Sequence, residues 1–312
     1  MVSYRLLSAE EMPTAVHLWV SVFGVEAPFF QTLLDGGDPD DFSLGAFDNG
    51  RLVSSVHVFM RWFRDRSGEP MKVGGIGSVS TLPEARSQGH SQRLLKMAID
   101  EMEKRECVWS ALGTGVNDHY ARHGYRTISS PYFRGFLKSG LSGTVSKPVA
   151  VDSKLLVHLE NVHIAYTRSR PMANDRSKKL WQHSAVYRTT RPNHQVFTSQ
   201  QGGTVTAYLV CGASNEQIDL IEAGCLDGHL TELHSLIENR LALASEQNVK
   251  SAYYHLAEES GVFSAFSHAC IDIWPAEGRG WMARPLAERI SWPELAAIHA
   301  DPRGAKSDID NF

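Results

Sequence analysis

The chain has 312 residues, a formal net charge of −4 and an isoelectric point near 6.4. This length predicts about two domains, each large enough to bury a core. The slightly acidic balance argues against nucleic acid as the main partner, because nucleic-acid-binding proteins favour a basic surface. The charges are spread along the chain, which gives no support for a membrane-surface role.

The sequence also bears on compartment and metal content. The N-terminus lacks the apolar core of a signal peptide, and no apolar run reaches about 18 residues, so we expect a cytoplasmic protein without a membrane partner. The four cysteines are widely separated, which favours free, buried thiols over disulfides or zinc. His119 and His123 have the spacing of a metal site, but no third ligand is evident and we expect no metal.

The first half predicts helices that alternate with strands. A helix opens at Ser8 with a capping-box pattern and runs to Gly24, and Asp48-Asn49-Gly50 between two apolar stretches is a strong hairpin signal. Periodicity predicts the other elements: a short helix at 29–34, strands at 72–81 and 108–112, helices at 91–105 and 118–122, and a strand from 125. This order indicates an α/β fold, a mixed sheet with flanking helices.

The junction between the strand at 72–81 and the helix at 91–105 is the most informative segment. An apolar run ends at Pro83, an Arg86-x-x-Gly89-x-Ser91 turn follows, and the helix begins at once. Such a turn leaves backbone N–H groups unpaired at the helix N-terminus, where the dipole favours negative charge. It therefore predicts a pyrophosphate site, although neither a P-loop nor a Gly-x-Gly-x-x-Gly motif is present.

This turn resembles the acetyl-CoA pyrophosphate loop of the GNAT N-acetyltransferases. A second segment, Asn117 to Tyr125, is similar to the Tyr-x-x-x-Gly-(Phe/Tyr) segment of that fold, in which a helix tyrosine lies near the CoA sulfur. Together the two segments give a fairly specific match to that family over roughly the first half of the chain. The resemblance implies an N-acetyltransferase that uses acetyl-CoA as co-substrate and takes a small-molecule amine or a protein lysine as acceptor.

The resemblance also assigns cofactor-binding residues. The edge N–H groups of Val79, Ser80 and Thr81 would pair with pantetheine like an added strand, and one of them would stabilise the tetrahedral oxyanion. The glycines of this strand, Gly74, Gly75 and Gly77, would permit a bulge that opens a slot for the cofactor. The backbone N–H groups of the loop would bind the pyrophosphate, and the side chain of Arg86 would add positive charge. The loop residues assigned to this role are Arg86, Ser87, Gln88, Gly89, His90, Ser91 and Gln92.

Two residues are candidates for proton transfer. Tyr120 occupies the general-acid position of the family, and a phenol with a pKa of about 10 is protonated at neutral pH. Its alternative is a core tyrosine, and where many members carry an Asn seven positions earlier this chain has Gly113. In the enhanced-intracellular-survival (Eis) branch the carboxylate of a terminal Phe enters the active site, and this chain ends in Phe312. The alternative for Phe312 is a frayed polar tail.

An acidic set follows the first helices: Asp35, Asp38, Asp40 and Asp41. The simplest interpretation is a solvated loop. The alternative is attraction of a polycationic amine, because GNAT folds form the acceptor side of the cleft there.

The second half repeats the order of hairpin, strand, long helix and strand, with a final strand at 281–286. We therefore predict tandem GNAT folds: a first domain at 1–141, a degenerate copy at 150–290 and a C-terminal tail at 291–312. The copy has Asp227 between Cys225 and Gly228 in place of the phosphate loop and should not bind CoA. The arrangement is similar to the Eis branch, without room for its full sterol-carrier-like domain.

Two rival functions remain open. One is a tandem-GNAT aminoacyl transferase that uses charged tRNA, and the other is a catalytically silent CoA-binding or structural module. A homo-oligomer is compatible with the resemblance, because Eis-like proteins commonly assemble through their repeats.

Overall fold

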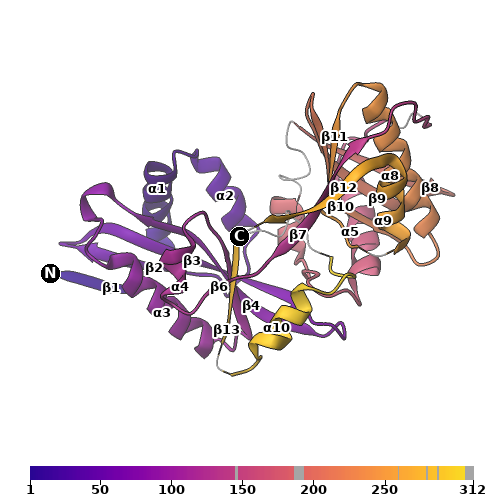
Figure 1. The fold of residues 1–312 in the computed structure, drawn as a ribbon. Helices are drawn as coiled ribbons and strands as arrows, with labels where there is room; N and C mark the ends of the chain where they lie inside the picture. Colours follow the sequence, from indigo (N-terminus) through magenta and orange to yellow (C-terminus); the bar gives the residue numbers. More distant parts are fainter. Residues whose placement is uncertain (145–146, 186–192, 259, 279, 287, 306–312) are drawn as a thin grey trace.

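The protein, seen here in a computed structural model, forms two lobes that are each built on one mixed β-sheet (Figure 1). The structure describes residues 1–144, 147–185, 193–258, 260–278, 280–286 and 288–305. Within these ranges no helix combines the length and the apolar character needed to cross a membrane.

The sheet of the first lobe has seven strands, and only its β4–β5 pair is parallel. Their spatial order is β1 (Val2–Leu6), β2 (Phe42–Asp48), β3 (Arg51–Arg64), β4 (Pro70–Thr81), β5 (Trp109–Gly113), β13 (Trp281–Pro285) and β6 (Arg126–Thr127).

The sheet of the second lobe has six strands, and again only one pair, β10–β11, is parallel. Their spatial order is β12 (Cys270–Gly278), β7 (Ser130–Leu137), β11 (Ser251–Tyr254), β10 (Gln217–Cys225), β9 (Thr204–Ala213) and β8 (His194–Gln201).

Helices cover both faces of each sheet. In the first lobe α1 (Met12–Phe23) and α2 (Ala27–Asp35) pack on one face, while α3 (His90–Lys104) and the short α4 (Asn117–Ala121) contribute to the core on the other. In the second lobe α8 (Leu230–Glu246) and α9 (Ser260–Ala269) share one core, while α5 (Ser153–Thr167) packs on the opposite face. The remaining elements are η1 (Ala9–Glu11), η2 (Pro83–Ala85), α6 (Lys178–Leu180), the π-helical turn η3 (Trp181–Ala185) and α10 (Trp292–His299).

The two sheets exchange strands. Strand β7 follows the first-lobe elements in sequence but pairs with β11 and β12 in the second sheet. Strand β13 comes from the second half of the chain but lies between β5 and β6 in the first sheet. The prediction that residues 281–286 complete the second copy was therefore wrong, and the ranges 1–141 and 150–290 do not each hold one whole sheet.

Local sequence explains the well-predicted elements. The capping box of Ser8 and Glu11 is formed, and Gly24 ends α1 in a left-handed conformation with φ = 66°. The apolar residues Leu94, Leu95 and Ala98 of α3 are fully buried against the sheet. The predicted repeat is also observed, since β8, β9, β10, α8 and β11 follow the order of β2, β3, β4, α3 and β5.

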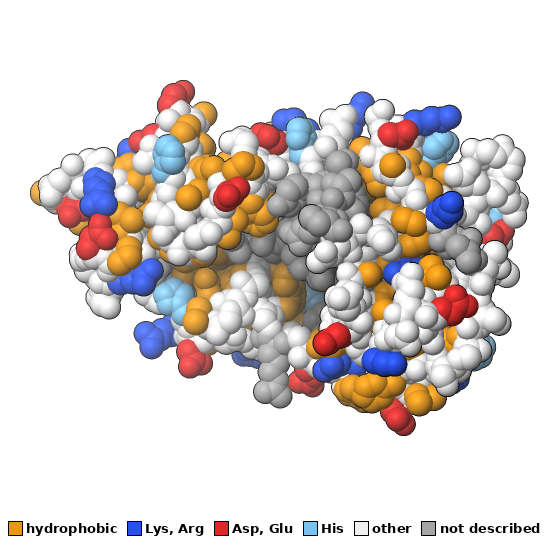
Figure 2. Space-filling view, turned by 90° about the horizontal axis from the view of Figure 1, so that it is seen from above, with side chains coloured by type: hydrophobic (Ala, Val, Ile, Leu, Met, Phe, Trp, Pro, Cys, Tyr) orange, Lys and Arg blue, Asp and Glu red, His pale blue; other side chains and the backbone are white. Residues whose placement is uncertain are grey.

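Other parts differ from the expectation. The structure adds α5, α9 and β12 to the second lobe, and the segment expected as a tail begins with α10. Leu295 and Ile298 of α10 are buried in one core with Trp109 of β5, so this helix is an integral part of the first lobe. Figure 2 shows that the surface between the lobes is hollowed, with hydrophobic side chains at its floor.

Candidate functional site

The central feature of the site is an opening between β4 and β5. The parallel pairing of these strands runs from Val73–Trp109 to Ile76–Leu112 and ends there, while β4 continues to Thr81 against β3. A strand that continues without its neighbour exposes main-chain N–H and C=O groups along one edge. An extended ligand can pair with such an edge by strand addition.

A bulge in β4 lies directly beyond this point. Ser55 pairs with Ser80 and His57 with Gly77, so two steps along β3 match three steps along β4. The extra residue falls at Ser78–Val79, and Ser78 has φ = 49°. The predicted bulge is therefore confirmed, although a serine rather than one of the three glycines adopts its left-handed conformation.

The loop between β4 and α3 is open at the surface and turns on two left-handed residues, Ser87 with φ = 63° and Gly89 with φ = 80°. The first backbone bond of α3 joins the N–H of Arg93 to the carbonyl of Gly89. The preceding N–H groups, from His90 to Gln92, are thus the terminal donors that an α-helix leaves without intrahelical acceptors. Turns with left-handed residues followed by a helix N-terminus form concave anion sites.

Side chains of the loop take different directions. The Arg86 guanidinium is exposed and lies back over the strand end, with its Nε 3.4 Å from the Thr81 carbonyl oxygen. His90 is buried, and its Nδ1 lies 2.8 Å from the Tyr4 hydroxyl. His90 can therefore offer a ligand its backbone N–H, while its side chain anchors the start of α3 to β1.

The Gln92 side chain joins the loop to α4. Its Oε1 accepts a hydrogen bond from His123 Nε2 at 2.7 Å, and its Nε2 donates to His119 Nδ1 at 3.2 Å. Burial lowers the pKa of both histidines, which favours their neutral forms. Each histidine thus uses one ring nitrogen to contact Gln92. Tyr120 lies between His119 and His123 in sequence, and both are hydrogen-bonded to the first turn of α3.

Tyr120 is 8% exposed and belongs to the same core cluster as Leu94 of α3, with Val79 of β4 packed against that cluster. Its hydroxyl is hydrogen-bonded to the side chain of Thr114, directly after β5. Burial raises the pKa of Tyr120, and the bond to Thr114 opposes this only in part. The phenol is therefore a protonated donor at neutral pH. The sequence reasoning did not identify Thr114.

A chain of buried hydroxyl groups fixes the end of β4. The Trp19 indole of α1 donates to Ser55 Oγ at 2.8 Å, and Ser55 Oγ lies 3.0 Å from Ser80 Oγ. One residue earlier on β3, Ser54 Oγ donates to the Ser80 carbonyl and lies 2.8 Å from Thr81 Oγ1. The side chains of Ser80 and Thr81 are thus engaged in the sheet, and their contribution to a ligand would come from the main chain.

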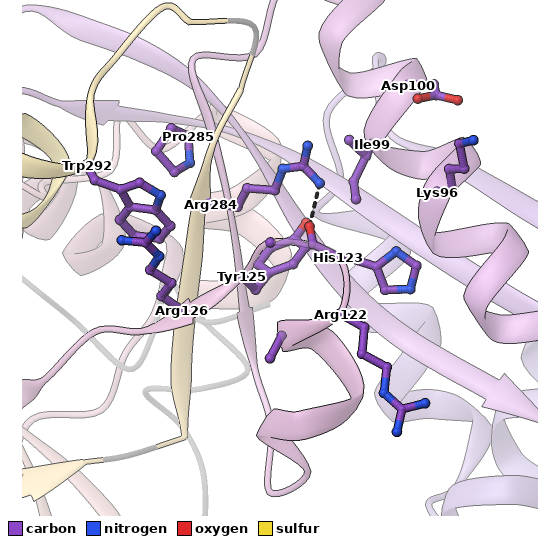
Figure 3. Close-up of a pocket in the computed structure, with 12 residues that line it drawn as sticks. Lys96, Ile99, Asp100, Arg122, His123, Tyr125, Arg126, Arg284, Pro285 and Trp292 are labelled. Atoms are coloured by element: carbon purple, nitrogen blue, oxygen red, sulfur yellow. Dashed lines mark hydrogen bonds between the residues drawn. The ribbon is translucent and has the colours of Figure 1, made fainter.

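A basic cavity of about 830 Å³ lies beside α3 and the end of α4 (Figure 3). Cationic side chains from three segments line it, and Arg284 of β13 donates to the His123 carbonyl. Lys96 lies one helical turn beyond Gln92 on α3, and Arg122 ends α4. The lining also includes the carboxylate of Asp100, so the cavity has cationic side chains in excess beside the middle of α3.

The acidic set is solvated only in part. Asp35 and Asp40 are exposed, but Asp41 has a side-chain exposure of 10%, and its carboxylate accepts from the backbone N–H groups of Met60 and Asp38. Burial raises its pKa to about 6. Asp40 pairs with Lys72 at 2.5 Å. The interpretation of a solvated loop is therefore wrong for Asp41, while Asp35 and Asp40 are exposed as that interpretation expects.

Phe312, the predicted source of a catalytic carboxylate, lies outside the described residues.

Taken together, three features define a tandem α/β fold of the acyltransferase type: a parallel strand pair that opens beside a bulge, a left-handed turn that leads into the next helix, and a repeat of the same topology. Comparison with known proteins agrees. Residues 3–128 match the family model described as acetyltransferase (GNAT) domain. An uncharacterized N-acetyltransferase of Streptomyces avermitilis is 27% identical over 175 residues, which are 51% of this chain and 42% of that protein.

Solved structures share the fold along nearly the whole chain. A conserved protein of unknown function from Enterococcus faecalis V583 superposes with a TM-score of 0.70 and 19% identity, over 92% of this chain and 73% of its own. Eis1 from Mycobacterium abscessus gives a TM-score of 0.59 at 15% identity, with 91% and 73% covered. Residues 3–128 are therefore similar to the GNAT N-acetyltransferases, and the chain as a whole carries two GNAT-like sheets.

Proposed function

We propose that this protein transfers the acetyl group of acetyl-CoA to an amine, and that the reaction takes place in the first lobe. The observation that carries this proposal is the connection between three features of the first lobe. The open edge of β4 leads into the donors at the start of α3, and the Gln92 side chain ties this helix to His119 and His123, which flank Tyr120 in sequence.

The substrate would be held by the main chain. The N–H groups of residues 87–92 would bind the diphosphate, and the exposed Arg86 with Lys96 and Arg122 would add positive charge along the same side. The pantetheine arm would extend along the edge of Val79, Ser80 and Thr81 as an added strand. These residues remain proposed ligands, and their backbone geometry supports the assignment.

The chemistry requires one bond to form and one to break. The neutral amine attacks the thioester carbonyl carbon, a C–N bond forms, and negative charge develops on the carbonyl oxygen, where an N–H group of the β4 bulge would stabilise it. The C–S bond then breaks, and Tyr120 would give its proton to the departing thiolate. The nitrogen loses its proton to solvent, and the Tyr120 phenolate takes one back from solvent, so that the enzyme returns to its starting state. The acceptor class is a small-molecule amine or a protein lysine.

An acceptor screen tests this proposal against its rivals. Calorimetry with acetyl-CoA measures binding, and thiol release is followed with aminoglycosides, polyamines and lysine peptides in parallel. Binding together with thiol release that depends on one acceptor class would support the proposal. Binding without release by any amine would favour a silent module, and transfer from a charged tRNA in place of acetyl-CoA would favour the aminoacyl transferase.

A further inference from the structure

Three potential metal ligands converge on the surface of the second lobe, away from the candidate acetyl-CoA site. His234 and Glu238 lie four residues apart on α8 and therefore share one helix face, and His268 lies near the end of α9. One ligand atom from each of the three side chains lies within 4.8 Å of the others. We refer to His234, Glu238 and His268 as the α8–α9 triad.

The distances within the triad are longer than those of direct ion pairs and compatible with a shared metal ion. Glu238 Oε2 lies 3.3 Å from His234 Nδ1, and Glu238 Oε1 lies 3.4 Å from His268 Nδ1. Charge-assisted N–H···O bonds are shorter, at about 2.7–2.9 Å. Two ligand atoms each about 2.1 Å from a tetrahedral zinc ion lie about 3.4 Å apart.

Ser264 is positioned to orient His234. Its hydroxyl oxygen lies 3.3 Å from the Gly261 carbonyl oxygen and 3.1 Å from His234 Nε2, so a hydroxyl that donates to the carbonyl accepts from His234 Nε2. In that tautomer Nε2 carries the proton, and Nδ1 of the neutral ring presents a lone pair to the Glu238 carboxylate. Two lone pairs that face each other repel unless a cation lies between them.

A divalent cation would stabilise this group of two imidazoles and one carboxylate better than protonation of the two rings. One carboxylate faces two imidazoles, so protonating both rings would place two positive charges beside a single negative one. Lys138, which donates to the carbonyl of His268, adds a further positive charge nearby. A metal ion instead accepts the lone pairs of two neutral imidazoles and one carboxylate, and the orienting bond from Ser264 is typical of such sites.

We propose that the α8–α9 triad is a zinc-binding site that joins α8 to α9. Two histidines and one glutamate give three protein ligands, and the partial exposure of the triad leaves the fourth position to water. The sequence did not reveal this site, because His268 is thirty residues from Glu238 along the chain. The proposal is independent of the acetyl-transfer function.

Zinc titration of the full chain tests the proposal. The metal-free protein is titrated with Zn²⁺ at pH 8 against a colorimetric chelator of known affinity, and thermal unfolding is measured with and without the metal. We expect one high-affinity equivalent per chain and a higher Tm with zinc. His268→Ala and Glu238→Ala should each weaken binding at least tenfold, and Ser264→Ala, which removes the orienting bond, should weaken it about 10- to 100-fold.

His229→Ala is the matched control. His229 also lies at α8 and pairs with Glu232 at 2.9 Å, but it belongs to no three-ligand group among the described residues. This variant should bind zinc like the wild type. Equal zinc affinity in His268→Ala and the wild type, or the same loss in His229→Ala, would overturn the proposal, because binding would then arise from scattered surface histidines.

Discussion

The anion-binding role of the loop can be tested at one glycine. Gly89 precedes α3 with φ = 80°, and a Cβ built on it has no heavy atom within 4 Å. Replacing Gly89 by Ala therefore introduces no steric clash within the chain. It only penalises the left-handed backbone that aims the N–H groups of the loop, at a cost of about 1–2 kcal/mol.

Gly203 provides a matched control in the second lobe. It lies in the hairpin between β8 and β9 with φ = 83°, and its Cβ would likewise meet nothing within 4 Å. Gly89→Ala and Gly203→Ala should therefore lower the free energy of unfolding by similar amounts, about 1–2 kcal/mol. Only the first variant alters the loop at the start of α3.

The two variants should differ in acetyl-CoA affinity. If relaxation of the loop removes one charge-assisted hydrogen bond to the diphosphate, Gly89→Ala loses about 1.5–3 kcal/mol of binding, roughly a 10- to 100-fold rise in Kd. Gly203→Ala should bind like the wild type. Calorimetry gives both Kd values, and urea unfolding gives both stabilities. Unchanged affinity in Gly89→Ala, at the expected loss of stability, would refute the assignment of the diphosphate to this loop.

Three further outcomes follow from the structure. Tyr120→Phe should lower kcat about 100- to 10,000-fold with unchanged acetyl-CoA Kd, because the thiolate loses its proton donor; thiol-release kinetics and calorimetry check this. Burial lowers the pKa of His57 to about 3, so the neutral ring's contribution to stability is present above its ordinary pKa of 6.5 and is lost as the pH falls toward 3. The urea midpoint of unfolding should therefore decrease less on acidification in His57→Gln than in the wild type. Gly74→Ala places a Cβ 2.1 Å from Met102 Sδ and should cost about 1–3 kcal/mol in urea unfolding, less when Met102→Val is added.

Much of the fold was accessible from the sequence because its signals are local. The hairpin at Asp48-Asn49-Gly50, the capping box at Ser8 and the apolar face of α3 each depend on neighbours within a few residues. The turn at Arg86–Gly89 is equally local, and its predicted position at the start of a helix is observed.

The exchange of β7 and β13 was not accessible in the same way. Periodicity shows that a segment is extended, but it does not specify which strand it pairs with, since both sheets offer an antiparallel edge beside their parallel pair. The burial of Asp41 was not predicted from the sequence for a related reason. Its nearest strand contact, the Met60 N–H, is nineteen residues away, and a run of aspartates looks like a solvated loop on its own.

Within the candidate site, sequence reasoning identified the backbone donors but missed the side chains that hold them. Gln92 was assigned for its N–H group, yet its amide joins α3 to His119 and His123. Thr114 attracted no attention because a single threonine after a strand carries no pattern. Both act through contacts that only the packed structure brings together.

The exchanged strand gives the second lobe a structural role in the first. Strand β13 lies between β5 and β6, its residues Met282 and Ala283 are buried, and Arg284 holds the carbonyl of His123 beside α4. The Gly280 carbonyl accepts from the Thr114 N–H at 2.6 Å, next to the side chain that bonds Tyr120. Without this strand β5 would be an open edge and the tyrosine segment would lose its support. The second half of the chain therefore contributes a strand and side-chain contacts to the first lobe, next to the segment that bears Tyr120.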